Sequence, residues 1–187
     1  MKTINTYINE KLRLTAKQQY TCQPKDQQEL ETIIIDRIKN DGPTCDLNDI
    51  DVSKIKYMIF LFDAKSNTIF KDFNGDISQW DVSNVKDMCG MFHGCEKFNC
   101  DISAWNVSNV EDMYGMFYRC GEFNQDISKW NVSNVDNIQS MFYKCKNFNQ
   151  NLDSWDALNG KYKYMAYAFE DCPTTPSWYD RKKWEQC

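Results

Sequence analysis

Glycine, proline and histidine are scarce in this chain of 187 residues, which has seven glycines, four prolines and a single histidine. A phosphate-binding loop needs closely spaced glycines, and no such motif occurs. We also find no set of serine, histidine and acid suited to nucleophilic catalysis. The sequence therefore predicts no catalytic residues.

Long apolar runs are missing as well. The longest one, residues 57–62, is far too short to cross a bilayer. The opening stretch, MKTINTYINEKLRL, lacks the continuous apolar segment of a signal peptide. We expect no membrane insertion and a cytoplasmic location, or else delivery to a virion or cell surface by a non-standard route.

Basic residues are too few for a nucleic-acid partner. The formal net charge is −5, and the one dense basic cluster is residues 181–183. Because a protein neutralises phosphates with a basic face, we exclude DNA and RNA binding.

Cysteine is abundant, but the usual cysteine motifs are not. Nine cysteines cannot all pair within one chain, and no Cys-x-x-Cys motif of the zinc or thiol-redox kind occurs. We expect free thiols. The densest group of possible metal ligands is MCGMFHGCEKFNC, residues 88–100, which holds three cysteines and the histidine.

An internal repeat accounts for most of that group. Three copies match without a gap at a period of 25, in residues 76–100, 101–125 and 126–150. Two diverged copies flank them, in residues 46–62 at an offset of 30 and in residues 151–172 after a short insertion. The sequence thus predicts five coils stacked on one another.

A cysteine recurs once in each later coil, three residues after a phenylalanine, at positions 95, 120, 145 and 172. A small side chain that recurs at one place in every coil is typical of a buried column rather than of a ligand. The cysteines and histidine outside this column are Cys89, His93 and Cys100, and tyrosine or glutamine replaces each of them in other coils. These three remain candidates for zinc or copper, but we favour an accidental cluster and predict no metal and no cofactor.

Two local patterns define the expected coil. Asp-Ile-Ser-x-Trp favours a short strand, and Val110–Phe117 favours about two turns of helix. A strand plus a short helix every 25 residues is typical of a leucine-rich-repeat coil. We therefore predict an α/β repeat solenoid.

The repeat W-[DN]-V-S-N-V-x-x-M-x-x-M-F-x-x-C-x-x-F-N-x-D-I-S also resembles that of the BspA-like leucine-rich repeat surface proteins, which occur in bacteria and phages. The resemblance covers residues 46–172. It implies right-handed coils, no catalytic activity, and binding to proteins or host surfaces.

Caps are expected at both ends because a terminal coil has an uncovered apolar face. Asp26 and Glu29 have capping-box spacing, an apolar stripe follows, and Gly42-Pro43 ends the segment, which predicts an N-terminal helix. We divide the chain into a helical N-terminal cap segment (1–45), a solenoid (46–172) and a C-terminal cap (173–187), in which Ser177 and Asp180 could start a short helix. An apolar cover is expected over Tyr57, Ile59 and Phe60, and the stripe at residues 4, 7, 8 and 12 predicts another amphipathic helix, available for self-association.

Two columns are candidates for binding. The first is acidic, and we favour backbone hydrogen bonding for its carboxylates over recognition of a cation or basic partner: Asp76, Asp101 and Asp126. The second varies between coils and should face solvent: Gln79, Ala104 and Lys129.

We therefore predict a non-catalytic protein-protein interaction module with a protein partner. The alternatives are a structural or assembly component, for instance of a virion, and a metal or thiol enzyme. A solenoid end offers a second route to self-association.

Overall fold

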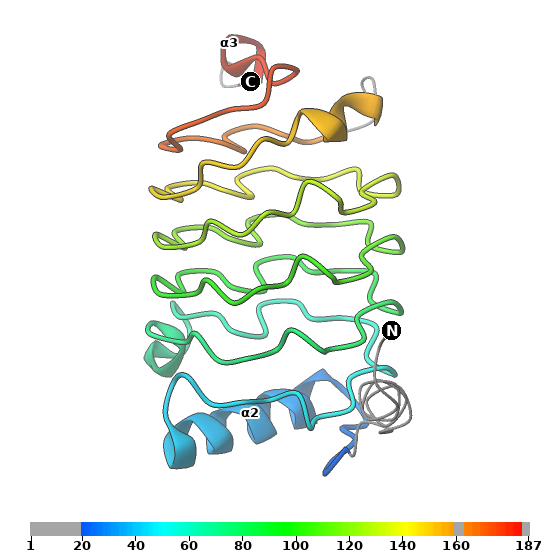
Figure 1. The fold of residues 1–187 in the computed structure, drawn as a ribbon, viewed down its shortest axis with the longest axis vertical. Helices are drawn as coiled ribbons and strands as arrows, with labels where there is room; N and C mark the ends of the chain where they lie inside the picture. The colour runs from blue at the N-terminus through cyan, green and yellow to red at the C-terminus, as the bar shows by residue number, and fades with distance from the viewer. Residues whose placement is uncertain (1–19, 159–162, 185–187) are drawn as a thin grey trace, which may run out of the picture.

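The computed structural model describes residues 20–158 and 163–184, and within these ranges the chain winds into flat, stacked coils (Figure 1). Helix α2 (Gln27–Asp41) lies across one end of the stack and the short helix α3 (Arg181–Trp184) at the other. Two 3₁₀ helices, η1 (Thr68–Phe70) and η2 (Asp153–Leu158), interrupt the coils. We number the coils one to five: 46–75, 76–100, 101–125, 126–150 and 151–172.

The prediction of an α/β repeat solenoid is wrong, because the coils of the described chain contain turns and isolated parallel bridges instead of strands and α-helices. Backbone N–H groups of the Asp-Ile-Ser-x-Trp segment donate to acceptors within the same segment. The N–H of Ser103 donates to Asp101 Oδ1 at 3.0 Å, and the N–H of Trp105 donates to the Ile102 carbonyl at 3.1 Å. A strand needs these groups for its neighbour, so none forms.

The expected helix is absent because backbone N–H groups of this segment donate to carbonyl groups of the next coil. The N–H groups of Gly115, Phe117 and Arg119 donate to carbonyl groups of coil four at 2.9, 2.9 and 2.7 Å. Gly115 and Arg119 also have φ of 56° and 60°, which lies outside the right-handed helical region. An α-helix needs those N–H groups for carbonyls four residues back, so the segment runs as successive turns.

Three Asx turns shape each of coils two to four, and in coil four the accepting side chains are those of residues 126, 131 and 137. In coil two, the carboxylates of Asp76, Asp81 and Asp87 each accept a hydrogen bond from the N–H two residues later, at 3.0, 3.1 and 2.8 Å. Coil three repeats them at positions 101, 106 and 112. Such side-chain to backbone bonds favour turns over regular structure, which explains the architecture.

Side-chain ladders join the coils. The N–H groups of Asn99, Asn124 and Asn149 each donate to the Oδ1 of the asparagine 25 residues earlier, at 2.9 Å. These residues form an asparagine ladder, in which Asn149 is exposed and Asn99 half-buried. The backbone groups between coils thus find partners without a sheet.

The core consists of stacked columns, as the repeat predicted. Phe117 is fully buried and lies between Phe92 and Phe142, with ring centroids 5.7 and 5.6 Å away. Cys120 is fully buried as well, and its thiol donates to the Phe92 carbonyl oxygen at 3.0 Å. The described cysteines are all free thiols.

Helix α2 closes the first coil where the sequence predicted a helix. Asp26 accepts a hydrogen bond from the N–H of Glu29, the Glu29 carboxylate accepts one from the N–H of Lys25, and Gly42 ends the helix with φ of 89°. The buried face carries Leu30, Ile34 and Ile38. These side chains belong to the same apolar cluster as the first coil.

The C-terminal end differs from its prediction in one detail. Helix α3 is capped by Asp180, whose Oδ1 accepts from the N–H of Lys182 at 3.0 Å, whereas the N–H of Ser177 donates to Asp153. The predicted amphipathic helix near residues 4–12 lies outside the described residues, and the division at residues 45 and 172 stays a prediction. Within the described ranges, no helix has the length and apolar character needed to cross a membrane.

Candidate functional site

One side of the stack carries most of the exposed aromatic side chains. We call it the ladder face, and it consists of residues 56–64, 86–94, 111–119, 136–144 and 163–171. Along it, alternate N–H groups donate to the next coil, for example Gly90 to the Tyr114 carbonyl and Gly94 to the Tyr118 carbonyl, both at 2.7 Å. The backbone is therefore held at regular intervals. Side chains at equivalent positions of successive coils therefore lie in columns, for example Tyr118 beside Tyr143.

Exposed aromatic residues concentrate on the ladder face. Six large apolar side chains of the described chain are more than a third exposed, and five lie here: Tyr57 (52%), Phe60 (40%), Tyr114 (37%), Tyr164 (56%) and Tyr167 (38%). The expected cover over the first coil is therefore wrong for Tyr57 and Phe60. Ile59 is half-buried, and the side-chain amide of Gln27 bonds its backbone N–H and carbonyl at 3.1 and 2.6 Å, which is a polar contact instead of the expected apolar cover.

Three rings form a stack down this face. The His93 ring lies 4.7 Å from the Tyr118 ring at an interplanar angle of 12°, and Tyr118 lies 4.7 Å from Tyr143 at 9°. Phe60 meets His93 edge-on at 6.0 Å. Because neighbouring rings occupy one another's faces, the stack presents mainly its edges, which does not suit a flat sugar ring.

His93 is paired with a buried carboxylate of coil one. Its Nδ1 lies 2.8 Å from Oδ1 of Asp63, which is 5% exposed. Burial alone would raise the pKa of Asp63, but hydrogen bonds from the Ser66 side chain, the Lys65 N–H and His93 hold that pKa below its ordinary value. Since the Ser66 hydroxyl donates to Asp63 and not to His93, these residues do not form a nucleophilic relay.

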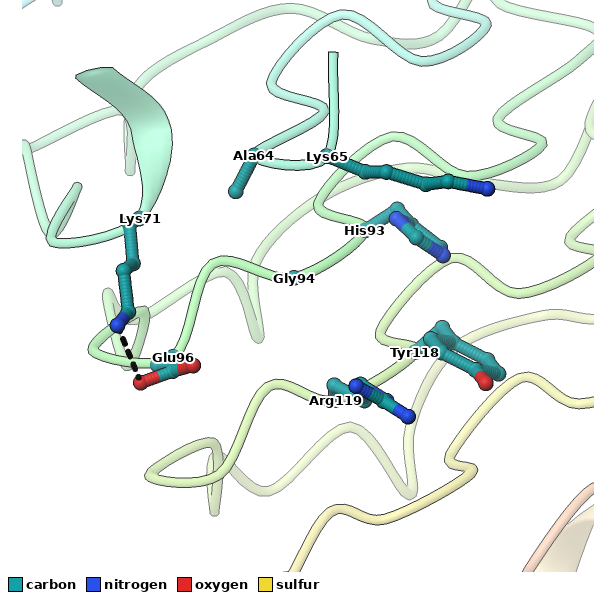
Figure 2. A pocket seen from close by; sticks show the side chains of 8 residues that line it. All are labelled: Ala64, Lys65, Lys71, His93, Gly94, Glu96, Tyr118 and Arg119. Carbon is teal, nitrogen blue, oxygen red and sulfur yellow. Dashed lines mark ion pairs between the residues drawn. The ribbon is translucent and has the colours of Figure 1, made fainter. Parts of the chain in front are cut away.

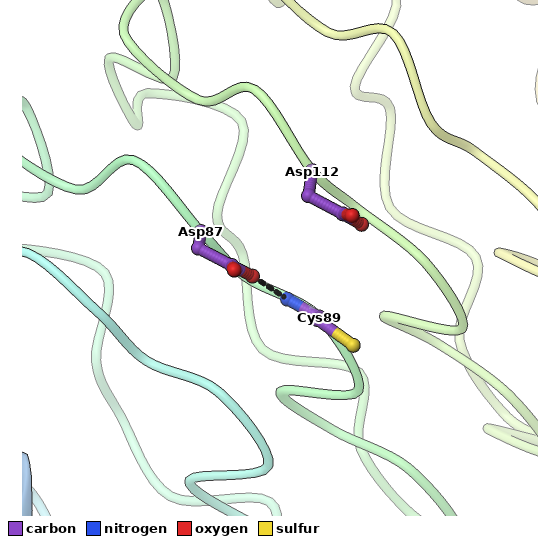
Figure 3. A group of neighbouring side chains, drawn as sticks. All are labelled: Asp87, Cys89 and Asp112. Carbon is purple, nitrogen blue, oxygen red and sulfur yellow. Dashed lines mark hydrogen bonds between the residues drawn. The ribbon is translucent and has the colours of Figure 1, made fainter. Parts of the chain in front are cut away.

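A second cluster lies nearby, where Asp87, Cys89 and Asp112 converge (Figure 3). Their ligand atoms all lie within 4.8 Å of one another. Burial raises the pKa of the Cys89 thiol to about 12, and the Asp112 and Asp87 carboxylates add to the shift. A cation bound here would have to displace the thiol proton, and the second oxygen of Asp112 already accepts a hydrogen bond from Asn137 at 2.9 Å.

The three predicted metal candidates do not meet. Cys89 lies close to Asp87 and Asp112, and His93 is hydrogen-bonded to Asp63. The Cys100 thiol lies 3.9 Å from Asp76. In the described part of the chain, the group at residues 87, 89 and 112 is the one set of three metal-capable side chains that converge.

The predicted binding residues lie elsewhere on the stack, and all are exposed: Asp76, Asp101, Asp126, Gln79, Ala104 and Lys129. A shallow hollow brings together the members of these columns from coils two and three, residues 76, 79, 101 and 104, but not the two from coil four. Hydrogen bonds from the serine two residues later lower the pKa of all three aspartates. The favoured interpretation of this column as backbone caps agrees with the geometry.

Replacing Asp87 by asparagine, which keeps a side-chain oxygen for the Cys89 N–H, should stabilise the fold at pH 7. Burial and the neighbouring carboxylates of Asp112 and Glu111 raise the pKa of Asp87, against the opposing hydrogen bond from the Cys89 N–H. Ionised Asp87 is thus less favourable in the folded state, a cost that appears as the pH rises through the ordinary carboxyl value near ~4. We expect a gain of about 1 kcal/mol in urea unfolding at pH 7, the scale of one like-charge contact in water, and a smaller gain at pH values below ~4.

Asp101→Asn is the matched control. The Ser103 hydroxyl and N–H favour the ionised form of Asp101 and lower its pKa, so this substitution should reduce stability at pH 7. A loss of stability in both variants would contradict the assignment of repulsion to residues 87 and 112.

Comparison with known proteins identifies a family but not a function. A family model described as "Mycoplasma protein of unknown function, DUF285" matches residues 39–155 and 64–181. This family is related to BspA-like repeat proteins in general. No curated protein and no solved structure matches the chain. Because the match covers more than half of its residues, the chain belongs to the DUF285 family.

Proposed function

We propose that this protein is a non-catalytic protein-interaction module that binds its partner through the ladder face. One observation carries the proposal, namely that five of the six exposed large apolar side chains of the described chain lie there. The likeness of its repeats to those of BspA-like leucine-rich repeat surface proteins, a finer relationship that we also propose, supports a binding role.

The composition and rigidity of the ladder face support docking. Interfaces are enriched in tyrosine and arginine, and this face carries exposed Tyr114, Tyr164 and Tyr167 as well as exposed Arg119. The bonds between coils hold the backbone under these side chains in place, so little conformational entropy is lost on binding.

The state of the reactive groups supports a role without catalysis. Burial raises the pKa of Cys95, Cys120 and Cys145 well above its ordinary value, which keeps these thiols protonated and poorly nucleophilic. The Nδ1 of His93 is paired with Asp63, and the His93 ring is stacked on Tyr118.

The test is affinity capture from a lysate of the native host with two matched variants. Tyr114→Ser/Tyr167→Ser alters the ladder face, and Gln79→Ser/Lys129→Ser alters the predicted binding columns. We expect wild type and the second variant to retain one partner protein that the first variant loses. Loss with the second variant alone would move the binding site to the predicted columns and overturn the proposal.

A different result would favour the predicted structural or assembly role, with virion association as one form. Its signature is oligomerisation that depends on concentration and disappears when residues 1–15 are deleted. Analytical ultracentrifugation of the full chain and the deletion variant measures this directly.

A further inference from the structure

A hollow opens in the ladder face beside His93 because one column loses its long side chains there (Figure 2). Coils three and four carry Arg119 and Lys144 in this column, whereas coils one and two carry Ala64 and Gly94. Gly94 has φ of 78°, close to the 60° of both long residues, so the backbone follows the same path. The missing side chains, and not a break in the stack, therefore create the space.

Positive charge lines this hollow. Lys65, Lys71 and Arg119 contribute to its wall, and Glu96 is the lining carboxylate, which pairs with Lys71 at 3.6 Å. Within the described part of the chain, no carboxylate pairs with the side chains of Lys65 and Arg119. The Asp63 carboxylate behind His93 is occupied by its own hydrogen bonds. An acidic chain, of formal net charge −5, thus presents two uncompensated cations at one hollow.

Arg119 lies close to an aromatic ring. Its guanidinium carbon lies 5.6 Å from the centroid of Tyr118, whose faces are occupied by His93 and Tyr143. A planar guanidinium suits two-point recognition of a carboxylate.

An apolar hollow adjoins the charged one. It shares Lys65, His93 and Tyr118 with the charged hollow and adds the exposed rings of Phe60 and Tyr114, together with the polar side chains of Asp63 and Ser66, so its apolar part is the side formed by the two rings. A ligand that fills both therefore needs an anion beside an apolar group. A polypeptide with a glutamate or aspartate next to an aromatic or aliphatic residue has this chemistry.

We infer that the charged hollow binds an acidic side chain of an extended partner segment, whose neighbouring apolar side chain packs on Phe60 and Tyr114. This inference rests on the proposed function and specifies the chemistry of its partner. Lys65 and Arg119 hold the carboxylate, and the small residues at positions 64 and 94 admit it.

The test is an NMR titration of the whole protein with two peptides, acetyl-Phe-Glu-Phe-Glu-amide and its glutamine counterpart, at ~0.15 M salt. The glutamate peptide should cause saturable shifts of the Gly94 and Arg119 amides. The glutamine peptide should bind about tenfold more weakly, the scale of one lost charge-assisted hydrogen bond. Equal binding of the two peptides would overturn the inference, and so would tighter binding of inorganic phosphate than of the glutamate peptide at the same amides.

Three variants locate the site. Arg119→Gln should abolish the preference for the glutamate peptide, and Gly94→Gln, which fills the hollow, should abolish its binding. Lys144→Gln is the matched control, because Lys144 occupies the same column over Tyr143 but lies outside the hollow. An equal loss with Lys144→Gln and Arg119→Gln would show diffuse charge attraction instead. Since Arg119 is exposed, its variant keeps the test decisive if Gly94→Gln folds poorly.

The two proposals can fail separately. If the partner captured by wild type still binds Arg119→Gln but not Tyr114→Ser/Tyr167→Ser, the docking role stands and the carboxylate site falls. If no captured protein is lost with Tyr114→Ser/Tyr167→Ser, the proposed function is wrong, whatever the result of the peptide titration.

Discussion

Replacing Phe117 by alanine should lower the free energy of unfolding by about 3–5 kcal/mol. The ring is fully buried at the centre of the stack and contacts phenylalanines of both neighbouring coils and of its own. Its removal leaves a cavity that the coils above and below cannot close, because the hydrogen bonds between coils fix their spacing. Urea unfolding followed by circular dichroism measures the loss, and the melting temperature should fall by about 10 °C.

Tyr114→Ala is the control for this experiment. Tyr114 is an aromatic residue of the same coil that is 37% exposed, so its loss should change stability by less than about 1 kcal/mol. Similar effects of the two substitutions would contradict a core made of stacked columns.

The second large effect is expected at the N-terminal end of the stack. Ile34→Ala removes a fully buried side chain from the face of α2 that covers the first coil (Figure 1). We expect a loss of about 2–5 kcal/mol, the usual cost of truncating a buried isoleucine. Weakened docking of α2 also uncovers the end of the coils, so the variant should self-associate.

Thr32→Ala on the exposed side of α2 is its control, and it should leave both stability and the oligomeric state close to those of wild type. Light scattering and urea unfolding test the two outcomes together. A variant at position 34 that stays monomeric and fully stable would show that α2 is not a cap.

Features that depend on repetition could be predicted from the sequence. A residue type that returns every 25 positions must occupy the same place in each coil, so the buried columns at Phe117 and Cys120 and the capping of both ends follow from the pattern. Helix α2 was predictable too, because its cap at Asp26 and its stop at Gly42 are local signals.

The local conformation of a coil could not be predicted in the same way. Alternating apolar residues followed by three-and-four spacing fit a strand and a helix, but they fit a series of turns equally well. The deciding facts are that aspartates bond the N–H two residues later and that non-glycine residues such as Arg119 and Ser140 adopt positive φ. Neither leaves a distinct signal in hydrophobic spacing.

Parts of the candidate site could have been predicted from the sequence. The offset of 30 between coils one and two already aligns Asp63 with His93, so that pair could have been predicted. The convergence of Asp87 and Cys89 was hidden by the expected helix, since residues two apart do not share a helical face. Chance differences between coils, such as Ala64 and Gly94 in a column that also holds Arg119 and Lys144, become informative only once the columns are known.

Deleting residues 101–125 tests most directly whether matching residues of successive coils lie on one another. This deletion joins Cys100 to Asp126 and places Phe92 against Phe142 and Cys95 against Cys145, contacts of the type already present. Deletion of residues 101–113 is the control, because it leaves half a coil, residues 114–125, between coils two and four, so that no column continues through this point.

The measurement is cooperative urea unfolding of both deletion variants, followed by tryptophan fluorescence. We predict one cooperative transition for the first variant and none for the second. Equal behaviour of the two variants, folded or unfolded, would contradict the account that register between coils holds this protein together.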